Sequence, residues 1–196
     1  MKKINEIFYS LQGEGRHTGR AAIFIRFSGC NLKCSFCDTD FKDYQEMSDE
    51  DILYKVEELR KDKIKDAGQP KPMIILTGGE PTMQVDGAFI DMFHAAGYFV
   101  AMESNGTKEP PKQLDWLTVS PKEHVKVAQC DELKCIFDGE HQVDTFGIKA
   151  YYYYLQPCDT GDAQKNQEIL SACVAYIEQH PKWRLSLQTH KLIGFK

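Results

Sequence analysis

The chain has 196 residues, a formal net charge of −5, and 42% hydrophobic and 27% charged residues. This composition is typical of an ordinary globular protein and fits a single domain over residues 1–196. The mild acidity does not favour nucleic acid or an anionic membrane as a partner, so we expect a small-molecule partner. We find no signal-peptide pattern and no run near the ~18 apolar residues of a membrane span. We therefore expect a cytoplasmic protein, in which seven cysteines indicate metal or redox chemistry rather than disulfides.

Apolar, β-branched runs predict strands over residues 21–27, 73–78, 98–104, 116–120, 132–137, 151–156 and 184–190. Apolar residues at helical spacing predict helices over residues 48–62, 86–97 and 163–180. The first helix begins at Ser48, a favourable N-cap, with Asp51 three residues later as an approximate capping box.

Helices that alternate with strands predict a parallel sheet with crossover helices. Residues 105–115 and 122–131 show no helical period, so we expect some crossovers to be trimmed. A complete eight-fold barrel typically needs ~250 residues, which is more than this chain has. The expected fold class is therefore α/β, a partial, open and reduced parallel α/β barrel. Its site should lie at the carboxyl ends of the strands.

Three cysteines, Cys30, Cys34 and Cys37, follow the first predicted strand with the spacing C-x3-C-x2-C. Thiolates are soft ligands that select zinc or iron–sulfur clusters. Structural zinc takes four ligands and a [4Fe–4S] cluster usually takes four cysteines, whereas this motif supplies three. Three thiolates would leave one iron open, and an open position is the mark of a catalytic metal site. The alternative is a zinc site that borrows a distant cysteine such as Cys158.

This motif after a first strand resembles the radical S-adenosylmethionine (SAM) superfamily. In that superfamily the open iron binds the amino and carboxylate groups of SAM, and one electron cleaves SAM to methionine and a 5′-deoxyadenosyl radical. The segment TGGEP (77–81) resembles the superfamily's Gly-Gly-Glu motif, whose backbone takes the methionine amino group. Taken alone, TGGEP fits an ordinary strand-to-helix turn equally well. The segment ESNGT (103–107) also resembles a superfamily segment.

Within this superfamily, the chain closely resembles the 7-carboxy-7-deazaguanine synthases over essentially its whole length. The matching segments are QGEG (12–15), CDT (37–39), SPK (120–122) and LSLQTHKLIG (185–194). The resemblance implies a carbon–nitrogen lyase of queuosine biosynthesis and tRNA modification. It would convert 6-carboxy-5,6,7,8-tetrahydropterin to 7-carboxy-7-deazaguanine with loss of ammonia, and would regenerate SAM. The protein would place C6 of the pterin and exclude water, while cluster and SAM carry the chemistry.

The resemblance also implies roles for individual residues. Cys30, Cys34 and Cys37 would hold the [4Fe–4S] cluster. The implied SAM-binding residues are Phe36, Cys37, Asp38, Gly79, Ser120, Pro121, Lys122, Gln156, Pro157, Cys158 and Asp159. The implied substrate-binding residues are Leu11, Gln12, Gly13, Arg26 and Thr77. Arg26 is the lone charge in an apolar strand and suits the substrate carboxylate, although an internal salt bridge is the alternative.

The resemblance further implies that Thr39 binds Mg²⁺ together with the substrate. One neutral hydroxyl is a weak magnesium site, so we expect poor affinity for the metal without substrate. The alternative is that Asp38 or Asp40 holds any metal. The implied partners are an external one-electron reductant, such as flavodoxin or ferredoxin, and a second copy of the chain in a homodimer. Roles for Glu14, which could accept a hydrogen bond from the pterin ring, and for Glu103, Cys130 and the C-terminal tail stay open.

Two other functions are compatible with the cysteine motif. A glycyl-radical-enzyme activase uses the same spacing but acts on a protein, so it needs no pterin-reading turn. The QGEG turn, Arg26 and the Asp-Thr pair after the last cysteine favour a small acidic heterocycle instead. A non-catalytic iron–sulfur protein would need neither TGGEP nor SPK.

Overall fold

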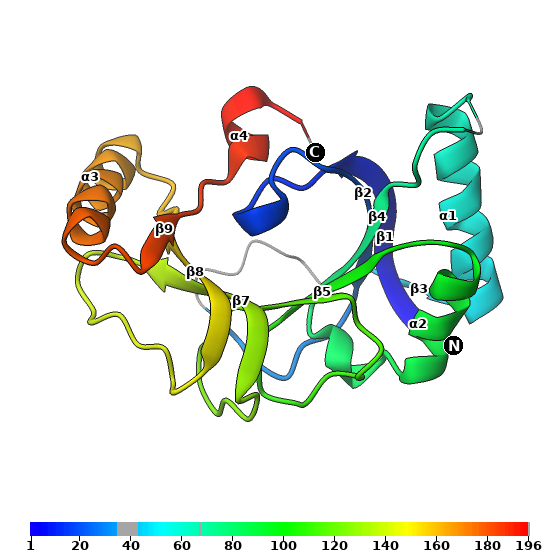
Figure 1. Ribbon diagram of the computed structural model, residues 1–196, viewed down its shortest axis with the longest axis horizontal. Coiled ribbons are helices and arrows are strands. Elements are labelled where there is room, and N and C mark those ends of the chain that lie inside the picture. Colours follow the sequence, from blue (N-terminus) through cyan, green and yellow to red (C-terminus); the bar gives the residue numbers. More distant parts are fainter. Residues whose placement is uncertain (35–42, 67, 196) are drawn as a thin grey trace.

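The computed structural model describes residues 1–34, 43–66 and 68–195. The strands form a 9-stranded sheet in the order β3-β1-β2-β4-β5-β6-β7-β8-β9. The strands from β2 (Ala21–Phe27) to β9 (Trp183–Leu185) pair in parallel, whereas β1 (Lys2–Leu11) runs antiparallel to β2 and to β3 (Gln45–Met47). Within the described residues β3 and β9 do not pair, so the curved sheet is an open barrel, as expected (Figure 1).

The central strands form where the sequence predicts them. Between β2 and β9 lie β4 (Met73–Gly78), β5 (Val100–Ser104), β6 (Trp116–Val119), β7 (Gln129–Phe137) and β8 (Lys149–Pro157). Four consecutive residues of β4, from Met73 to Leu76, are buried. A continuous buried run of this kind is expected of a parallel strand that is covered on both faces.

Helices cover the outer face of the sheet between β1 and β5 and again at β8 and β9. They are α1 (Asp49–Lys63), α2 (Gly87–Ala95) and α3 (Ala163–Gln179). The predicted capping box is confirmed, because Ser48 Oγ accepts from Asp51 N and the Asp51 side chain accepts from Ser48 N. Helix α1 packs on β1 and β2, α2 on β5, and α3 on β8 and β9. The apolar core lies between these helices and the sheet, on the outside of the curve (Figure 1).

The trimmed crossovers are confirmed. The segments 105–115, 120–128 and 138–148, which join β5 to β8, are all described and contain no helix. Three cysteines that we had not assigned to the site, Cys130, Cys135 and Cys173, lie buried in the core. Burial raises the pKa values of their thiols to about 12, 12 and 11 respectively. No described helix is both long enough and apolar enough to cross a bilayer.

The two ends of the chain differ from the sequence-based expectation. Strand β1 was not predicted, because the register shift between Ile4 and Glu6 breaks the alternation that marks a strand. The predicted strand over residues 184–190 is confirmed only at its start, because β9 ends at Leu185 and a short helix, α4 (Thr189–Ile193), follows. No strand pairs with the outer edge of β9 in the described sheet, so the chain leaves the sheet and turns across the barrel.

The opening between the two ends of the sheet is closed by the termini. The N-terminal turn with the short helix η1 (Gly15–His17) and the C-terminal α4 lie side by side in this opening (Figure 1). Thr189 donates from its backbone N and its Oγ1 to the Gly13 carbonyl, at 3.0 and 2.8 Å. The segments 12–17 and 186–193 therefore complete the wall of the barrel.

Candidate active site

A cavity of about 630 Å³ opens at the carboxyl ends of the parallel strands. It gathers most of the residues singled out in the sequence: Leu11, Gln12, Gly13, Arg26, Cys30, Cys34, Thr77, Gly79, Ser120, Lys122, Gln156, Pro157, Cys158 and Asp159. Pro121 is buried and does not line this cavity. The remaining predicted residues, Phe36, Cys37, Asp38 and Thr39, lie outside the described residues.

Two cysteines of the motif lie at one side of the cavity. Cys30 and Cys34 are free thiols. The Cys30 sulfur accepts from Leu32 N at 3.4 Å and from Asn105 Nδ2 at 3.8 Å. Hydrogen-bond donors of this kind favour a thiolate and tune a metal–sulfur centre. Among the described side chains no three potential metal ligands come together, and the third cysteine of the motif lies outside them. The chemistry of the two described cysteines fits an iron–sulfur cluster.

The segment before the cysteines packs directly against TGGEP. A Cβ atom on Gly79 would lie 1.8 Å from the Gly29 carbonyl oxygen, so this position tolerates only glycine. Gly79 N donates to the Phe27 carbonyl at 2.9 Å, and Glu80 N donates to the Gly29 carbonyl at 3.0 Å. The end of β4 therefore fixes the backbone from which the cysteine motif begins.

Glu80 joins TGGEP to ESNGT. Its side chain is 1% exposed. Its Oε1 accepts from Thr82 N, Thr82 Oγ1 and Ser104 Oγ at 3.1, 2.6 and 2.9 Å, and its Oε2 accepts from Asn105 N at 2.7 Å. Because Asn105 also donates to the Cys30 sulfur, this carboxylate fixes a donor beside the cysteines.

Glu103 lies in the part of the cavity that contains the predicted substrate residues. Its Oε1 accepts from Gln12 Nε2 at 2.9 Å and its Oε2 accepts from Thr77 Oγ1 at 3.0 Å. Sequence analysis left the role of this residue open, although it begins the ESNGT segment. The structure shows that its carboxylate holds two predicted substrate-binding side chains in place.

A buried ion pair joins Glu14 to Lys134, a residue of β7 that sequence reasoning missed. Glu14 also accepts from Gln156 Nε2 at 3.2 Å and from Gln188 Nε2 at 3.0 Å. Burial alone raises the pKa of Glu14, but the charge of Lys134 and the hydrogen bonds from Lys134 and Gln188 bring it below the ordinary value. Burial disfavours the charged form of Lys134, yet Glu14 and Glu103 hold the pKa of this ammonium above its usual range. Both side chains are charged at neutral pH.

Arg26 lines the cavity and also makes the internal salt bridge that we had considered as the alternative. Its Nε donates to Glu6 Oε1 at 3.0 Å. Its guanidinium lies 5.7 Å from the centre of the Phe8 ring. The neighbouring strand β1 thus orients this arginine at the edge of the cavity.

Two further polar groups line the cavity after the ends of β6 and β8. Lys122 Nζ donates to Ser120 Oγ at 2.7 Å and to the Ser120 carbonyl at 3.1 Å. Asp159, at the end of β8, pairs with Lys191 of α4 at 2.7 Å. The Lys191 hydrogen bond is the main reason that the pKa of Asp159 falls to about 2. This pair ties the cavity wall to the C-terminal helix.

Comparison with known proteins gives matches over the whole chain. The family model described as "Radical SAM superfamily" matches residues 24–125. A 7-carboxy-7-deazaguanine synthase of Bacteroides thetaiotaomicron is 47% identical over 198 residues, with 100% of both chains covered. The enzyme of the same name from Caulobacter vibrioides is 40% identical and covers 97% of each chain. The crystal structure of QueE from Escherichia coli matches with a TM-score of 0.69 and 26% identity, over 96% of this chain and 94% of that one.

Proposed function

Because this chain belongs to the radical SAM superfamily and, within it, to the 7-carboxy-7-deazaguanine synthases, we propose a full assignment of its reaction and site. The protein is a radical SAM lyase that converts 6-carboxy-5,6,7,8-tetrahydropterin to 7-carboxy-7-deazaguanine and ammonia, in the pathway to queuosine. The observation that carries this assignment is the full-length identity to enzymes of that name. Residues 1–196 form one catalytic domain.

One side of the cavity serves the cofactors, a [4Fe–4S] cluster and SAM. Cys30 and Cys34, with Cys37, would hold the cluster, and the Gly79 backbone would face the methionine end of SAM. Lys122, held by Ser120, is placed to pair with the methionine carboxylate. When bound, cluster and SAM supply the one-electron chemistry that removes a hydrogen atom from the substrate.

The other side of the cavity binds the pterin. A reduced pterin presents N–H donors along its ring, and the carboxylates of Glu14 and Glu103 are acceptors for such groups. Gln12 and Thr77 are held by Glu103, which fixes the direction of their hydrogen bonds. The ion pair with Lys134 keeps Glu14 ionised and therefore able only to accept. Arg26 carries the charge that suits the substrate carboxylate.

Gln156 has a different neighbour from the one that its SAM-binding role implies. Its amide donates to Glu14, so it lies next to the substrate turn. We assign Gln156 to the boundary between the two parts of the cavity, with Pro157, Cys158 and Asp159 on the SAM side.

Magnesium and the partners complete the proposal. Thr39 would bind Mg²⁺ together with the substrate carboxylate, so affinity for the metal should be poor without substrate. Tight Mg²⁺ binding in a calorimetric titration of substrate-free protein would contradict this role. Cys30 and Cys34 are half-buried, which suits electron entry from an external protein such as flavodoxin or ferredoxin. A homodimer is part of the proposal, and sedimentation velocity tests it.

The decisive experiment is anaerobic turnover of the reconstituted enzyme with SAM, reductant, Mg²⁺ and carboxytetrahydropterin. Mass spectrometry should detect 7-carboxy-7-deazaguanine. Cys34→Ala should abolish both product and SAM cleavage. Arg26→Met should retain slow 5′-deoxyadenosine formation while it loses most of the product, because only substrate binding is impaired. Wild-type enzyme that cleaves SAM but leaves the pterin untouched would overturn the proposed substrate.

A further inference from the structure

A second and much smaller cavity of about 10 Å³ lies next to the first, inside the barrel. Its lining is Gln12, Glu14, His17, Met73, Ile75, Ala101, Glu103, Trp116, Thr118 and Glu132. Gln12, Glu14, Glu103 and Thr118 line both cavities, so their side chains separate the small cavity from the substrate. A space of about 10 Å³ is close to the smallest that holds one water molecule, which needs roughly two to four polar partners.

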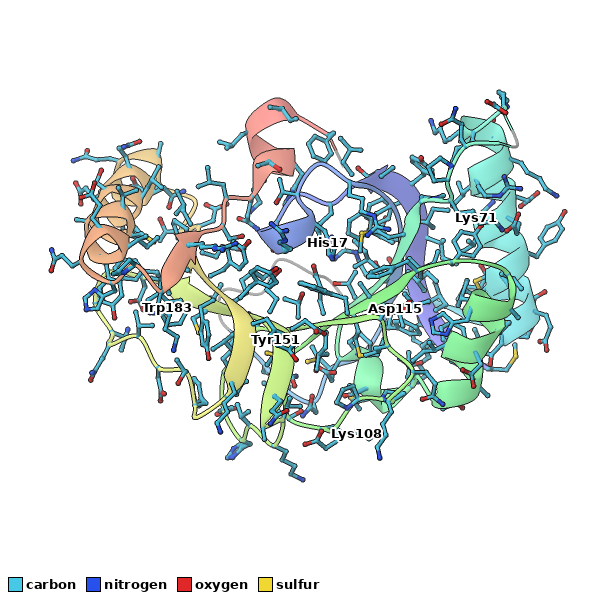
Figure 2. The ribbon with its side chains drawn as sticks, viewed as in Figure 1. His17, Lys71, Lys108, Asp115, Tyr151 and Trp183 are labelled. Carbon is cyan, nitrogen blue, oxygen red and sulfur yellow. The ribbon has the colours of Figure 1, made fainter. Side chains whose placement is uncertain are left out.

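His17 supplies one such partner. Its ring lies inside the curve of the sheet (Figure 2), at 4.6 Å from the Trp116 ring and 5.8 Å from the Phe99 ring. Among the described residues its Nε2 is the one buried side-chain nitrogen or oxygen without a hydrogen-bond partner. Burial, helped by the charges of Arg20 and Arg16, lowers the pKa of His17, so the ring is neutral. A buried polar atom in this position is normally satisfied by an internal water.

Glu132 supplies a second partner, and it is a carboxyl group that can change protonation state. It is 3% exposed, and its Oε2 accepts from Arg16 N at 2.8 Å. Burial is the main cause that raises its pKa to about 7, and the charges of Glu103 and Glu14 act in the same direction. The Arg16 N–H and the Lys134 ammonium oppose them. The charged and titratable groups that face Glu132 are Glu103, Glu14 and Lys134, together with His17, which lines the same cavity.

Glycine at position 15 allows Glu132 to lie so close to η1. Gly15 has a φ of 63°, and a Cβ there would lie 1.9 Å from Glu132 Oε1. Its N donates to Ser186 Oγ at 3.0 Å, so the turn is held from the C-terminal segment as well. The carboxyl group of Glu132 is therefore fixed by backbone on one side and faces the small cavity on the other.

We propose that the small cavity holds one water, and that this water passes protons between Glu132 and the carboxylate of Glu103 beside the substrate. The inference rests on the proposed function, because that ring contraction releases ammonia. The ammonia would leave as ammonium, taking one proton that Glu103 relays from the Glu132 carboxyl. The net change is that the O–H bond of the Glu132 carboxyl breaks and one N–H bond of ammonium forms, with no oxidation or reduction. The Glu132 carboxylate then recovers a proton from solvent.

The test compares Glu132→Gln with Glu132→Asp. Glutamine keeps the shape of the side chain and can still accept from Arg16 N, but it carries no exchangeable acid proton. Aspartate is shorter but keeps the acid. The relay predicts that Glu132→Gln lowers kcat roughly 10- to 100-fold with little change in KM, and that Glu132→Asp retains more activity. A purely structural role predicts the opposite order, because glutamine fills the space better.

The pH profile gives a second readout. The relay needs protonated Glu132, so wild-type kcat should fall as the pH rises through about 7, and this fall should be absent in Glu132→Gln. Infrared difference spectra between wild type and Glu132→Gln should show a carboxyl band that titrates near neutral pH without any turnover. A Glu132→Gln enzyme with wild-type rate and pH profile would overturn the relay while leaving the proposed function intact. The absence of product from wild-type enzyme would overturn both.

Discussion

Lys134 and Glu14 form a buried ion pair between the inner face of β7 and the turn that precedes η1. The two residues are 120 positions apart in the chain. Lys134 is 6% exposed, so little water screens the pair. The contact fixes the N-terminal turn inside the barrel and gives Glu14 its charge at the cavity surface.

Removal of the lysine should be strongly destabilising. In Lys134→Met, Glu14 remains as a buried charge without its cation, which typically costs about 3–5 kcal/mol. Urea unfolding should show this loss as a lower midpoint. The double variant Lys134→Met/Glu14→Gln should recover most of the stability, because no charge is left unpaired, and it should still bind the pterin poorly. A double variant no more stable than Lys134→Met would contradict this account.

The charged form of Glu14 should stabilise the folded protein, and this stabilisation should be lost in acid. The pKa of Glu14 in the folded protein lies below its ordinary value of 4.5, because the Lys134 pair outweighs the cost of burial. A depressed pKa adds stability that is present above about pH 4.5 and is lost as the pH falls through the folded value. Urea midpoints measured from neutral to acidic pH should therefore fall more steeply in wild type than in Glu14→Gln. Parallel curves would show that Glu14 has no such role.

Gly79→Ala should disrupt the cofactor side of the site. The added methyl group would meet the Gly29 carbonyl at 1.8 Å, so the backbone before Cys30 must move. We expect iron content after reconstitution and SAM affinity to fall at least about tenfold, since this backbone positions both. Gly139→Ala is the matched control, because a Cβ there meets nothing within 4 Å and only its φ of 79° is strained. The control should lose about 1 kcal/mol of stability and keep its iron.

Glu80→Gln should loosen the link between TGGEP and ESNGT. The amide has one acceptor oxygen where the carboxylate has two, so either Asn105 N or the group formed by Thr82 and Ser104 loses its acceptor. Loss of a buried hydrogen bond to a charged group costs about 1.5–3 kcal/mol. Amide hydrogen exchange should rise at Asn105 and Gly106 before it rises in β4. Unchanged exchange at these two amides would show that Glu80 does not hold the segment.

The sequence predicts the framework well, because the signals that it uses are local. Continuous apolar runs locate the central strands, and the Ser48 cap marks the start of α1. The cysteine motif and the TGGEP segment then fall at the carboxyl ends of neighbouring parallel strands, where topology brings them together. Of the predicted residues that the structure describes, all but Pro121 line the large cavity.

The acids and the lysine inside the barrel could not be predicted in this way. Glu132 and Lys134 alternate with Leu133 and Cys135 in β7, and this pattern is the same whether the polar face meets solvent or a barrel interior. The N-terminal turn closes the barrel over this face of β7, and only this tertiary contact puts Glu132 and Lys134 in the interior rather than in solvent. Strand β1 could not be predicted for a related reason, because the bulge between Ile4 and Glu6 interrupts the alternation of side chains.

The hydrogen bonds between Gly13 and Thr189 have a consequence for the order in which the two parts of the cavity can form during translation. The residues around the described cysteines, including Gly79, Glu80 and Asn105, are all translated within the first 105 positions. The pterin side also needs Ser186, Gln188 and Thr189, which are translated much later. A chain truncated before residue 186 would thus keep the residues that hold the backbone around Cys30 and would lack those that close the pterin side.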